Sequence, residues 1–259
     1  MASNTRETLR RSAHTSRASM SCSVMHPNVV MDTDWDGLEQ VLRGYARVTD
    51  EECAYLKRAF MATERMWAEN LAKVATVRLV MLAEAPQFGC GERYFYNIAT
   101  PFSSFFYFQD AEAILGRDFA KGRADKRFLL QELARAGFII LDLFPFALNK
   151  DDTPSITYKM SARRYQELFQ RTASFYFDRK RDSILQLGSP LFLFRYGTMK
   201  HRLGGLVDAE LAKRNIGPTQ SVGGTNMSLD REKLRQICHA VQTAPVAARR
   251  DNLSAGRRT

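Results

Sequence analysis

The sequence predicts an α/β protein in which helices cover both faces of a mostly parallel central sheet, a three-layer α/β/α arrangement. The first observation is a set of three short apolar runs, "TVRLVMLAEAP", "GFIILDLFPF" and "SPLFLFRYGT". None of them alternates apolar and polar residues as a half-exposed strand does, so we expect each strand to be buried on both faces. The second observation is that stretches with helical periodicity separate these runs, as crossovers between parallel strands require.

Start and stop signals place the helices. Thr49 stands three residues before Glu52, which is the spacing of a capping box, and apolar residues then recur at helical intervals to about Val74. Gly137 is a typical stop signal for the helix before the second strand. Further helices are expected at 110–115, at 125–136, from 161 into the 170s, from there to 187, at 207–214, and from 228 or 229 onward. A short strand or extended segment is expected just before the last helix.

Length and charge bound the organisation of the chain. With 259 residues and 45% hydrophobic content, the chain can bury a substantial core, which we assign to a single domain over residues 25–243. The net charge is +10, but residues 1–24 carry four Arg and one Glu and residues 244–259 carry four Arg and one Asp, so each of these segments accounts for +3. We expect the first to be a disordered basic leader and the last to be a flexible basic tail.

Several functional classes lack their sequence signals. No stretch reaches the roughly 18 apolar residues of a membrane span, so we expect an intracellular protein, cytoplasmic or nucleoid-associated, with no membrane partner. Cys22, Cys53, Cys90 and Cys238 are scattered without CxxC pairs, so neither a zinc site nor a disulfide framework is predicted. The GxxxxGKS/T loop, the GxGxxG fingerprint and the GxSxG elbow are also missing. We expect no metal and no cofactor.

The segment 159–181 is the densest internal source of positive charge, with seven basic residues against Glu167 and Asp178. Five aromatic residues are interleaved among them: Tyr165, Phe169, Phe175, Tyr176 and Phe177. Two interpretations remain open at this point. The basic side chains could neutralise phosphates while the rings stack on bases, or the helix could present a solvated basic face and an aromatic core face.

Polar side chains gather where the predicted strands end. In an open parallel sheet, ligands bind outside the carboxyl ends of the strands, because loops and helix N-termini meet there. That rule selects four loops, "AEAPQFGCGERYFYN", "DLFPFALN", "RYGTMKHR" and "SVGGTNMS". Their polar residues include Glu84, Gln87, Asn97, Asp142, Asn149, Arg195, Lys200, His201, Thr225 and Asn226. We expect these loops to meet around a site that grips a flat, polar ligand, such as a nucleobase.

Two carboxylates stand out in this set. Glu84 lies directly at a strand end, where low access to water perturbs a carboxylate, although it could instead pair with Arg93 or cap a helix. Asp142 lies inside an apolar strand, where a carboxylate needs a partner or a ligand, and a core arginine would serve as well. The glycine pair in "SVGGTN" lets the backbone approach a phosphate, but paired glycines also occur in ordinary turns.

The order of these motifs resembles the uracil-DNA glycosylase superfamily over residues 74–238. "MLAEAPQ" is similar to the Gly-Glu-Ala-Pro-Gly form of the family's first motif, with Ala83 and Gln87 in place of the two glycines, so Glu84 falls on the motif carboxylate. "RYFYN" stands where the family has a ring that stacks on the flipped base, which we assign to Phe95. The family's second strand ends in a base-reading Asn, where this sequence has Asp142. "GGTNMSLDREKL" occupies the place of a His-Pro-Ser motif without its His and Pro.

The resemblance implies a DNA-related function: a glycosylase-like protein that acts on or binds an extruded base. It makes Glu84 and Asn226 the expected catalytic residues, and Gln87, Phe95 and Asp142 the expected base-binding residues. The expected contacts to the nucleic-acid backbone are Lys200, Arg202, Gly224 and Thr225.

Glycosidic cleavage needs a carboxylate or an oriented water on one side of the sugar and stabilisation of the departing base on the other. Glu84 would supply the first, and Asn226, Thr225 and backbone amides would have to supply the second. Because Asp142 accepts hydrogen bonds where Asn both accepts and donates, reading uracil would need a protonated Asp142, or the base would need donor groups that face it.

Two other classes remain open. The first is a noncatalytic nucleic-acid-binding or interaction protein on the same fold. The second is a small-molecule hydrolase that uses Glu84 and Asp142 as a carboxylate pair, which would turn over free nucleosides. The leading partner is nucleic acid, specifically DNA.

Overall fold

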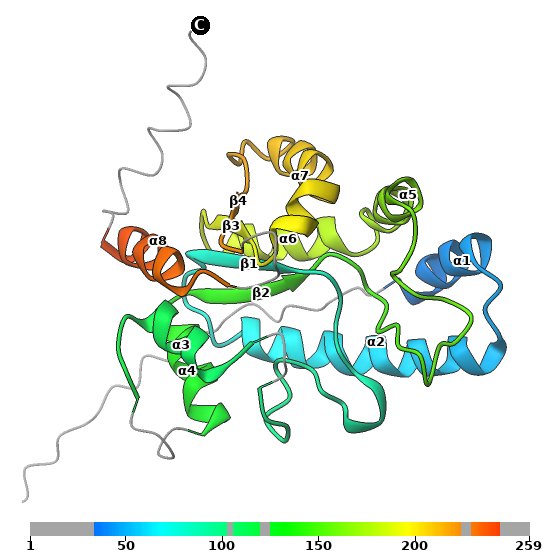
Figure 1. The fold of residues 1–259 in the computed structure, drawn as a ribbon, viewed down its shortest axis with the longest axis horizontal. Coiled ribbons are helices and arrows are strands. Elements are labelled where there is room, and N and C mark those ends of the chain that lie inside the picture. Colours follow the sequence, from blue (N-terminus) through cyan, green and yellow to red (C-terminus); the bar gives the residue numbers. More distant parts are fainter. Residues whose placement is uncertain (1–33, 103–105, 120–124, 224–228, 244–259) are drawn as a thin grey trace, which may run out of the picture.

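The computed structural model describes residues 34–102, 106–119, 125–223 and 229–243. Its central element is a four-stranded, all-parallel sheet in the order β2-β1-β3-β4 (Figure 1). The strands are β1 (Leu79–Ala83), β2 (Phe138–Asp142), β3 (Leu191–Phe194) and β4 (Gln220–Ser221). The prediction of an α/β protein with parallel strands is confirmed, and the three apolar runs form the three longest strands. The expected leader, 1–24, and the expected tail, 244–259, lie outside the described residues.

Helices lie on both sides of this sheet, with α2 and α4 below it and α7 above it in Figure 1. Every residue of β1 and β2 is buried, as expected for strands that are covered on both faces. The described helices are α1 (Trp35–Tyr45), α2 (Asp50–Leu71), α3 (Phe108–Leu115), α4 (Lys126–Arg135), α5 (Ala162–Thr172), α6 (Phe177–Gln186), α7 (Gly197–Ala212) and α8 (Arg231–Thr243), with a 3-10 turn η1 (Gly89–Gly91) after β1.

Local signals account for three helix starts. The Thr49 hydroxyl accepts a hydrogen bond from the backbone N–H of Glu52, and the Glu52 carboxylate accepts one from the backbone N–H of Thr49, which completes the predicted capping box of α2. Asp125 caps α4 and Ser161 caps α5 in the same way, each through a side-chain oxygen that accepts from a backbone N–H three residues later.

Gly137 joins α4 to β2 in a conformation that other residues rarely adopt. Its φ angle is +77°, and a Cβ at this position would collide with the carbonyl oxygen of Thr76. Its own carbonyl oxygen accepts hydrogen bonds from the backbone N–H groups of Arg78, at 2.8 Å, and Leu79, at 3.1 Å. The predicted stop signal of the helix is therefore also the point where β2 begins to pair with β1.

Side chains form hydrogen bonds with the backbone groups on the outer edge of β2. The backbone N–H of Ile140 donates to the Tyr96 hydroxyl at 2.6 Å, and the indole N–H of Trp67 donates to the Ile140 carbonyl oxygen at 2.9 Å. An open edge strand would offer these backbone groups to other chains. The two contacts tie α2 and the loop after η1 to the strand that ends in Asp142.

Two helices differ from the sequence-based expectation. Helix α1 was not predicted, although Trp35, Leu38 and Leu42 share its buried face. Helix α7 begins at Gly197 rather than near 207, so most of "RYGTMKHR" is helix and not loop. Its buried residues recur at every fourth position: Met199, Leu203, Val207 and Leu211. Glycines 197, 204 and 205 weaken the local helix propensity, so the pattern was not recognised in the sequence. Packing against β3 overrides this weak propensity.

The segment 159–181 turns its rings into the core. Tyr165, Phe169, Tyr176 and Phe177 are each at most 3% exposed, so they are not available to stack on bases. Several basic side chains on α5 remain at the surface; Arg171, for example, pairs with Glu167 at 2.7 Å. The structure therefore agrees with a solvated basic face over an aromatic core face. Lys180 and Arg181 are exceptions, because both are buried.

Candidate functional site

The two predicted carboxylates, Glu84 and Asp142, lie at the carboxyl ends of the neighbouring strands β1 and β2. Ala83 and Asp142 are register partners at the ends of these strands. Pairing continues beyond them, because the backbone N–H of Leu143 donates to Ala83 O at 2.9 Å and that of Phe144 donates to Glu84 O at 3.0 Å. The backbone segments that carry Glu84 and Asp142 are therefore held in a fixed relation at the carboxyl ends of the strands.

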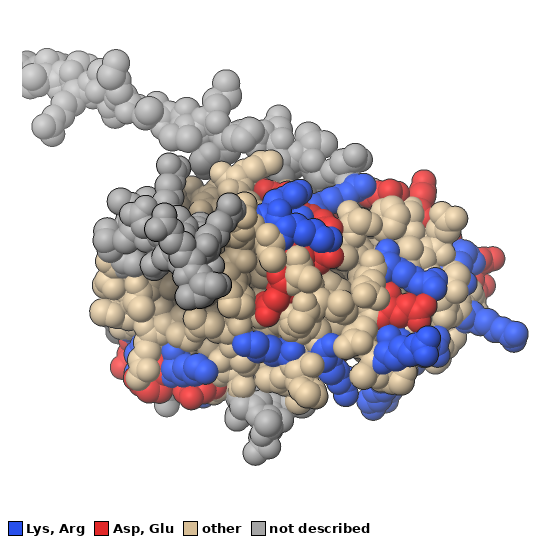
Figure 2. All heavy atoms as spheres, turned by 90° about the horizontal axis from the view of Figure 1, so that it is seen from above, with Lys and Arg blue, Asp and Glu red and all other residues tan. Residues whose placement is uncertain are grey.

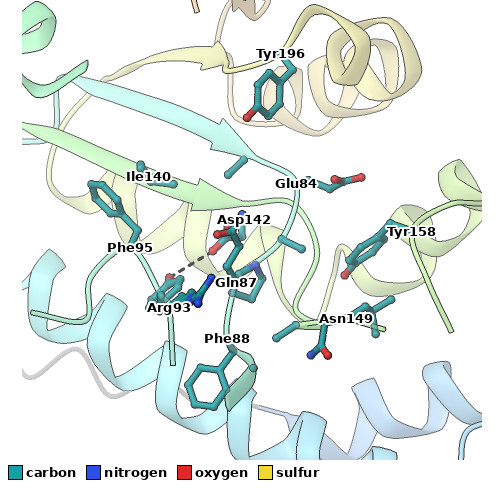
Figure 3. Close-up of a pocket in the computed structure, with 17 residues that line it drawn as sticks. Glu84, Gln87, Phe88, Arg93, Phe95, Ile140, Asp142, Asn149, Tyr158 and Tyr196 are labelled. Atoms are coloured by element: carbon teal, nitrogen blue, oxygen red, sulfur yellow. Dashed lines mark hydrogen bonds between the residues drawn. The ribbon is translucent and has the colours of Figure 1, made fainter. Parts of the chain in front are cut away.

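A cavity of about 460 Å³ opens at this edge (Figure 3). Sites for small organic ligands span about 300–1,000 Å³, so the cavity has the size of a ligand site. Four predicted site residues line it: Glu84, Gln87, Phe95 and Asp142. They are joined by Phe88, Arg93, Tyr94, Asn149, Tyr158 and Tyr196, and by smaller apolar residues. The lining combines several rings with a few convergent polar groups.

Glu84 is positioned by a tyrosine from a distant helix. The hydroxyl of Tyr165, on α5, donates to Glu84 Oε1 at 2.7 Å. The ring of Tyr165 is fully buried and packs edge-on against Phe144, with 4.9 Å between ring centroids. Among the described residues, no Lys, Arg or His lies within salt-bridge distance of Glu84, so the proposed pairing with Arg93 is not found. The Oε2 atom is left for a ligand or a water.

Asp142 is nearly sealed in the cavity wall, with 3% exposure. Its partner is the hydroxyl of Tyr94, which donates to Oδ2 across 3.4 Å (dashed line in Figure 3). No core arginine pairs with it among the described residues. Burial, and to a smaller extent the charge of Glu64, raise the pKa of Asp142, while Lys180 and the Tyr94 hydrogen bond lower it, and together they bring it to about 7. Its protonation therefore changes near neutral pH.

Phe95 forms a fixed wall of the cavity rather than a free stacking surface. It is 6% exposed, and its ring contacts Tyr96 and Phe106 edge-on, with centroid distances of 4.7 and 4.8 Å. It also stacks on Phe102, at 5.9 Å and 23° between ring planes. The lining rings with more accessible surface are Phe88, Tyr158 and Tyr196, all partly buried.

The remaining polar lining residues differ in how free they are. Gln87 and Arg93 are exposed at the opening of the cavity. Asn149 serves the fold: its amide N–H donates to the Tyr55 hydroxyl at 2.9 Å, and its Oδ1 accepts from two backbone N–H groups of the following turn. Gln87 and Arg93 are therefore the polar side chains best able to turn toward a ligand.

Lys200 and Arg202 are the two cations predicted to contact the nucleic-acid backbone, and Lys200 has a structural role instead. The ammonium group of Lys200 donates to the Thr219 carbonyl oxygen at 2.7 Å, so it ties α7 to the segment before β4. Arg202 is exposed, and its guanidinium lies 5.6 Å from the ring centroid of Tyr165, the residue that holds Glu84. The other predicted contacts, Gly224 and Thr225, and the predicted catalytic Asn226 lie outside the described residues.

Arg195 belongs to a different cluster. It is buried, and its Nη2 atom lies 3.7 Å from Asp110 Oδ2, while Arg231 donates to Asp110 Oδ1 at 2.8 Å. These contacts connect the end of β3 to α3 and α8. Arg195 therefore does not line the cavity, although the polar residues of its loop were expected to meet the others around one site.

The sequence-based reasoning missed Phe88, Tyr158 and Tyr196. Phe88 lies in the loop after β1, and Tyr196 follows β3 by two residues. Both therefore lie in loops that were expected to form the site, where only the polar residues were considered. Tyr158 carried no signal in the sequence: its hydroxyl donates to the Phe146 carbonyl oxygen at 2.7 Å, a contact that only the folded loop creates.

On the face of the molecule shown in Figure 2, charge alone does not mark a binding surface. On the face in Figure 2, Lys and Arg side chains stand apart, with Asp and Glu side chains between several of them. In the described ranges, no helix combines the length and apolar character needed to span a bilayer. The described cysteines, Cys53, Cys90 and Cys238, are free thiols, and no described group of three or more His, Cys, Asp or Glu residues is placed to hold a metal ion.

Comparison with known protein families, with curated proteins and with solved structures finds no match to this chain. The resemblance to the uracil-DNA glycosylase superfamily therefore remains a prediction that rests on the order of its motifs.

Proposed function

We propose that this protein receives a nucleobase extruded from DNA in the cavity beside β1 and β2, and that Glu84 gives it glycosylase-like activity. The observation that carries the proposal is that Glu84, Gln87, Phe95 and Asp142, which come from two separate stretches of the chain, surround one cavity of about 460 Å³. The order of motifs around Glu84 and Asp142, which resembles the uracil-DNA glycosylase superfamily, supports the same function.

The cavity suits a flat, polar ligand. Aromatic side chains form much of its wall, and a base extruded from DNA is held by such walls together with hydrogen bonds to its Watson–Crick edge. Asp142 supplies a hydrogen-bonding group in the wall, and Gln87 supplies an amide at the opening. Arg93 is an exposed residue of the cavity lining and Arg202 is exposed beside Tyr165, and both can approach backbone phosphates.

Glu84 has the properties of a group that orients water or stabilises a positively charged sugar. Its Oε1 atom is held by Tyr165, no described cation neutralises it, and its carboxylate remains partly exposed to the cavity. Loss of a base from deoxyribose passes through an oxocarbenium-like transition state, which an unpaired carboxylate stabilises. A fixed orientation through Tyr165 reduces the reorganisation that such stabilisation would otherwise need.

Base release from DNA tests this proposal. Single- and double-stranded oligonucleotides that carry one uracil, hypoxanthine or other altered base are incubated with the protein, with Glu84→Gln, and with Glu92→Gln as a control from the same loop. Glu92 is exposed and does not line the cavity. We expect release by the parent and the control, and a reduction by about 100-fold or more for Glu84→Gln. Equal release by all three proteins would contradict the role of Glu84.

A noncatalytic DNA-binding protein is the second candidate. It is favoured by the last motif, "GGTNMSLDREKL", which has no His to stabilise a departing base. This candidate predicts salt-sensitive, base-dependent binding with no release from any substrate. Turnover of free nucleosides without activity on DNA would instead identify a small-molecule hydrolase.

A further inference from the structure

Three buried ionisable side chains form a cluster in the wall of the cavity and behind it. They are Glu64 on α2, Lys180 on α6 and Asp142 at the end of β2, with exposures of 4%, 1% and 3%. Lys180 Nζ lies 2.5 Å from Glu64 Oε1 and donates to the Tyr176 hydroxyl at 3.0 Å. Of the three, Asp142 lines the cavity. The other two have no part in the chemistry proposed for Glu84.

Trp67 connects the ion pair to the strand that carries Asp142. Lys180 Nζ lies 4.4 Å from the centroid of the Trp67 ring. The indole N–H of the same ring donates to the carbonyl oxygen of Ile140, two residues before Asp142. Since the ring contacts both elements, the position of the Lys180 cation is fixed relative to the end of β2.

The charges of this cluster do not balance when every group is ionised. Two carboxylates and one ammonium leave a net charge of −1 in a region from which water is excluded, which is costly. The cluster is neutral when one carboxyl group holds a proton, and such coupled groups share that proton as a unit. Burial raises the pKa of Glu64 too, but Lys180 lies within ion-pair distance of Glu64 and favours its ionised form, so Asp142 is the better placed of the two to take the proton.

One oxygen of Asp142 remains open to a ligand. Oδ2 accepts from the Tyr94 hydroxyl, and none of the described residues donates to Oδ1. Because Asp142 lines the cavity, a molecule that fills the cavity can donate a hydrogen bond to this oxygen. Asp142 is therefore placed to make a direct hydrogen bond to a bound base.

We propose that Asp142 reads the hydrogen-bonding edge of the bound base, and that the Glu64–Lys180 pair selects the edge by setting whether Asp142 carries a proton. This inference rests on the proposed function. An ionised Asp142 presents acceptors alone: Oδ1 is open, and Oδ2 keeps a second lone pair beside the one that accepts from Tyr94. It therefore matches two adjacent donors, such as N1–H and N2–H of guanine. A protonated carboxyl group presents one donor and one acceptor, and matches the O6 and N1–H edge that guanine and hypoxanthine share.

Several other groups face Asp142 and contribute to its charge state. Tyr94 and Tyr96 come from the loop after η1, Tyr176 directly precedes α6, and Tyr158 comes from the loop that follows β2. All four hydroxyls are neutral at physiological pH, because burial raises their pKa values further above the ordinary value of 10.0. Lys180 and Glu64 are thus the neighbours whose charges act on Asp142 near neutral pH.

The first test needs no ligand. The Asp142 carboxyl carbon is followed by ¹³C NMR as pH changes, in the parent, in Glu64→Gln and in the double variant Glu64→Gln, Lys180→Met. Leaving Lys180 as an unbalanced cation should lower the pKa of Asp142 by about one unit or more. Removing both charges should raise this pKa above that of the parent, because the charge of Lys180 acts on Asp142 more strongly than the charge of Glu64 does. Glu232→Gln on α8, which is remote and exposed, should leave it unchanged. Equal Asp142 titrations in the parent and the double variant would overturn the role of the pair even if Glu64→Gln does not fold.

The second test compares two bases that differ by one amino group. The probes are oligonucleotides in which every position is abasic except one, which carries guanine or hypoxanthine. Their binding to Glu84→Gln, a variant chosen to prevent cleavage, is measured at about pH 5.5 and about pH 8. We expect similar affinities at the lower pH and about tenfold tighter binding of guanine at the higher pH. If the ratio of the guanine affinity to the hypoxanthine affinity does not change with pH, edge reading by Asp142 is overturned, but the proposed function is not. Absence of base-dependent binding at either pH, against an oligonucleotide without a base, would overturn the proposed function together with edge reading.

Discussion

Tyr165 and Glu84 are separated by 81 residues, yet the Tyr165 hydroxyl donates a hydrogen bond of 2.7 Å to Glu84 Oε1. This contact joins α5 to the loop after β1. It gives Glu84 a fixed orientation while leaving its second oxygen toward the cavity, which distinguishes Glu84 from a surface carboxylate whose charge is neutralised by a neighbouring cation.

Replacing Tyr165 with Phe should reduce the proposed activity on DNA without unfolding the protein. The ring keeps its packing against Phe144, but Glu84 loses a hydrogen bond to a charged group, which is worth about 1.5–3 kcal/mol, so kcat should fall by about tenfold or more. Base release and thermal unfolding are measured side by side. Tyr45→Phe is the matched control, because its hydroxyl donates to the Arg164 carbonyl oxygen away from the cavity. Equal rates for the two variants would show that Tyr165 does not position Glu84.

Replacing Tyr96 with Phe should destabilise the fold. The Tyr96 hydroxyl accepts from the buried backbone N–H of Ile140 at 2.6 Å, and without it that edge group of β2 has no partner. Leaving a buried donor unsatisfied costs about 1–3 kcal/mol. Urea unfolding of Tyr96→Phe is compared with that of Tyr107→Phe, whose ring is 46% exposed. The prediction is wrong if both variants unfold at the same midpoint.

The pH dependence of stability should change when Asp142 becomes Asn. Burial raises the folded-state pKa of Asp142 from 3.8 to about 7, so the folded protein holds this proton more tightly than the unfolded chain does. The group therefore contributes stability fully below about pH 4, and that contribution is lost as pH rises through about 7. Between about pH 5 and about pH 8, the parent should lose about 2–3 kcal/mol relative to Asp142→Asn, because the amide does not titrate. Parallel unfolding curves for both proteins over this range would contradict the prediction.

Lys126 should hold the aromatic loop that carries Phe95. Its ammonium group donates to the carbonyl oxygens of Asn97, at 2.7 Å, and Tyr94, at 3.3 Å, and burial lowers its pKa from 10.5 to about 8. Lys126→Met removes the ammonium donor from both carbonyl oxygens, which then keep only hydrogen bonds from within the loop itself. Amide hydrogen exchange of residues 94–100 should accelerate by about tenfold, a loss of local stability of about 1.4 kcal/mol. The exposed Lys57→Met serves as the control, and unchanged exchange in this loop would remove Lys126 from that role.

The parts of the fold that were predicted correctly depend on local chemistry. Thr49 and Glu52 lie three residues apart and form their capping box without help from the rest of the chain. Gly137 was predicted as a stop, because a left-handed residue favours glycine in any protein. Glu84 and Asp142 were predicted to meet because the ends of parallel strands share one edge of a sheet, and both line the cavity.

The parts that were missed depend on contacts between distant segments. Lys200 looked like a contact for a phosphate, but α7 brings it to the Thr219 carbonyl oxygen. Lys180 looked like one cation of a basic helix, but α6 buries it against Glu64, which is 116 positions earlier and shares no local pattern with it. Neither partner can be recognised from spacing, because the pairing follows from how helices pack and not from helical or strand periodicity.

The order of apolar runs, caps and glycines was enough to determine an α/β protein with buried parallel strands and carboxylates at their ends, since these features follow from backbone geometry and the burial of apolar side chains. Tertiary packing decided the rest. It placed Tyr165 on Glu84, turned the rings of 159–181 into the core, and set the Glu64–Lys180 pair behind Asp142, because the charge and orientation of a buried side chain depend on neighbours that only the folded chain brings within reach.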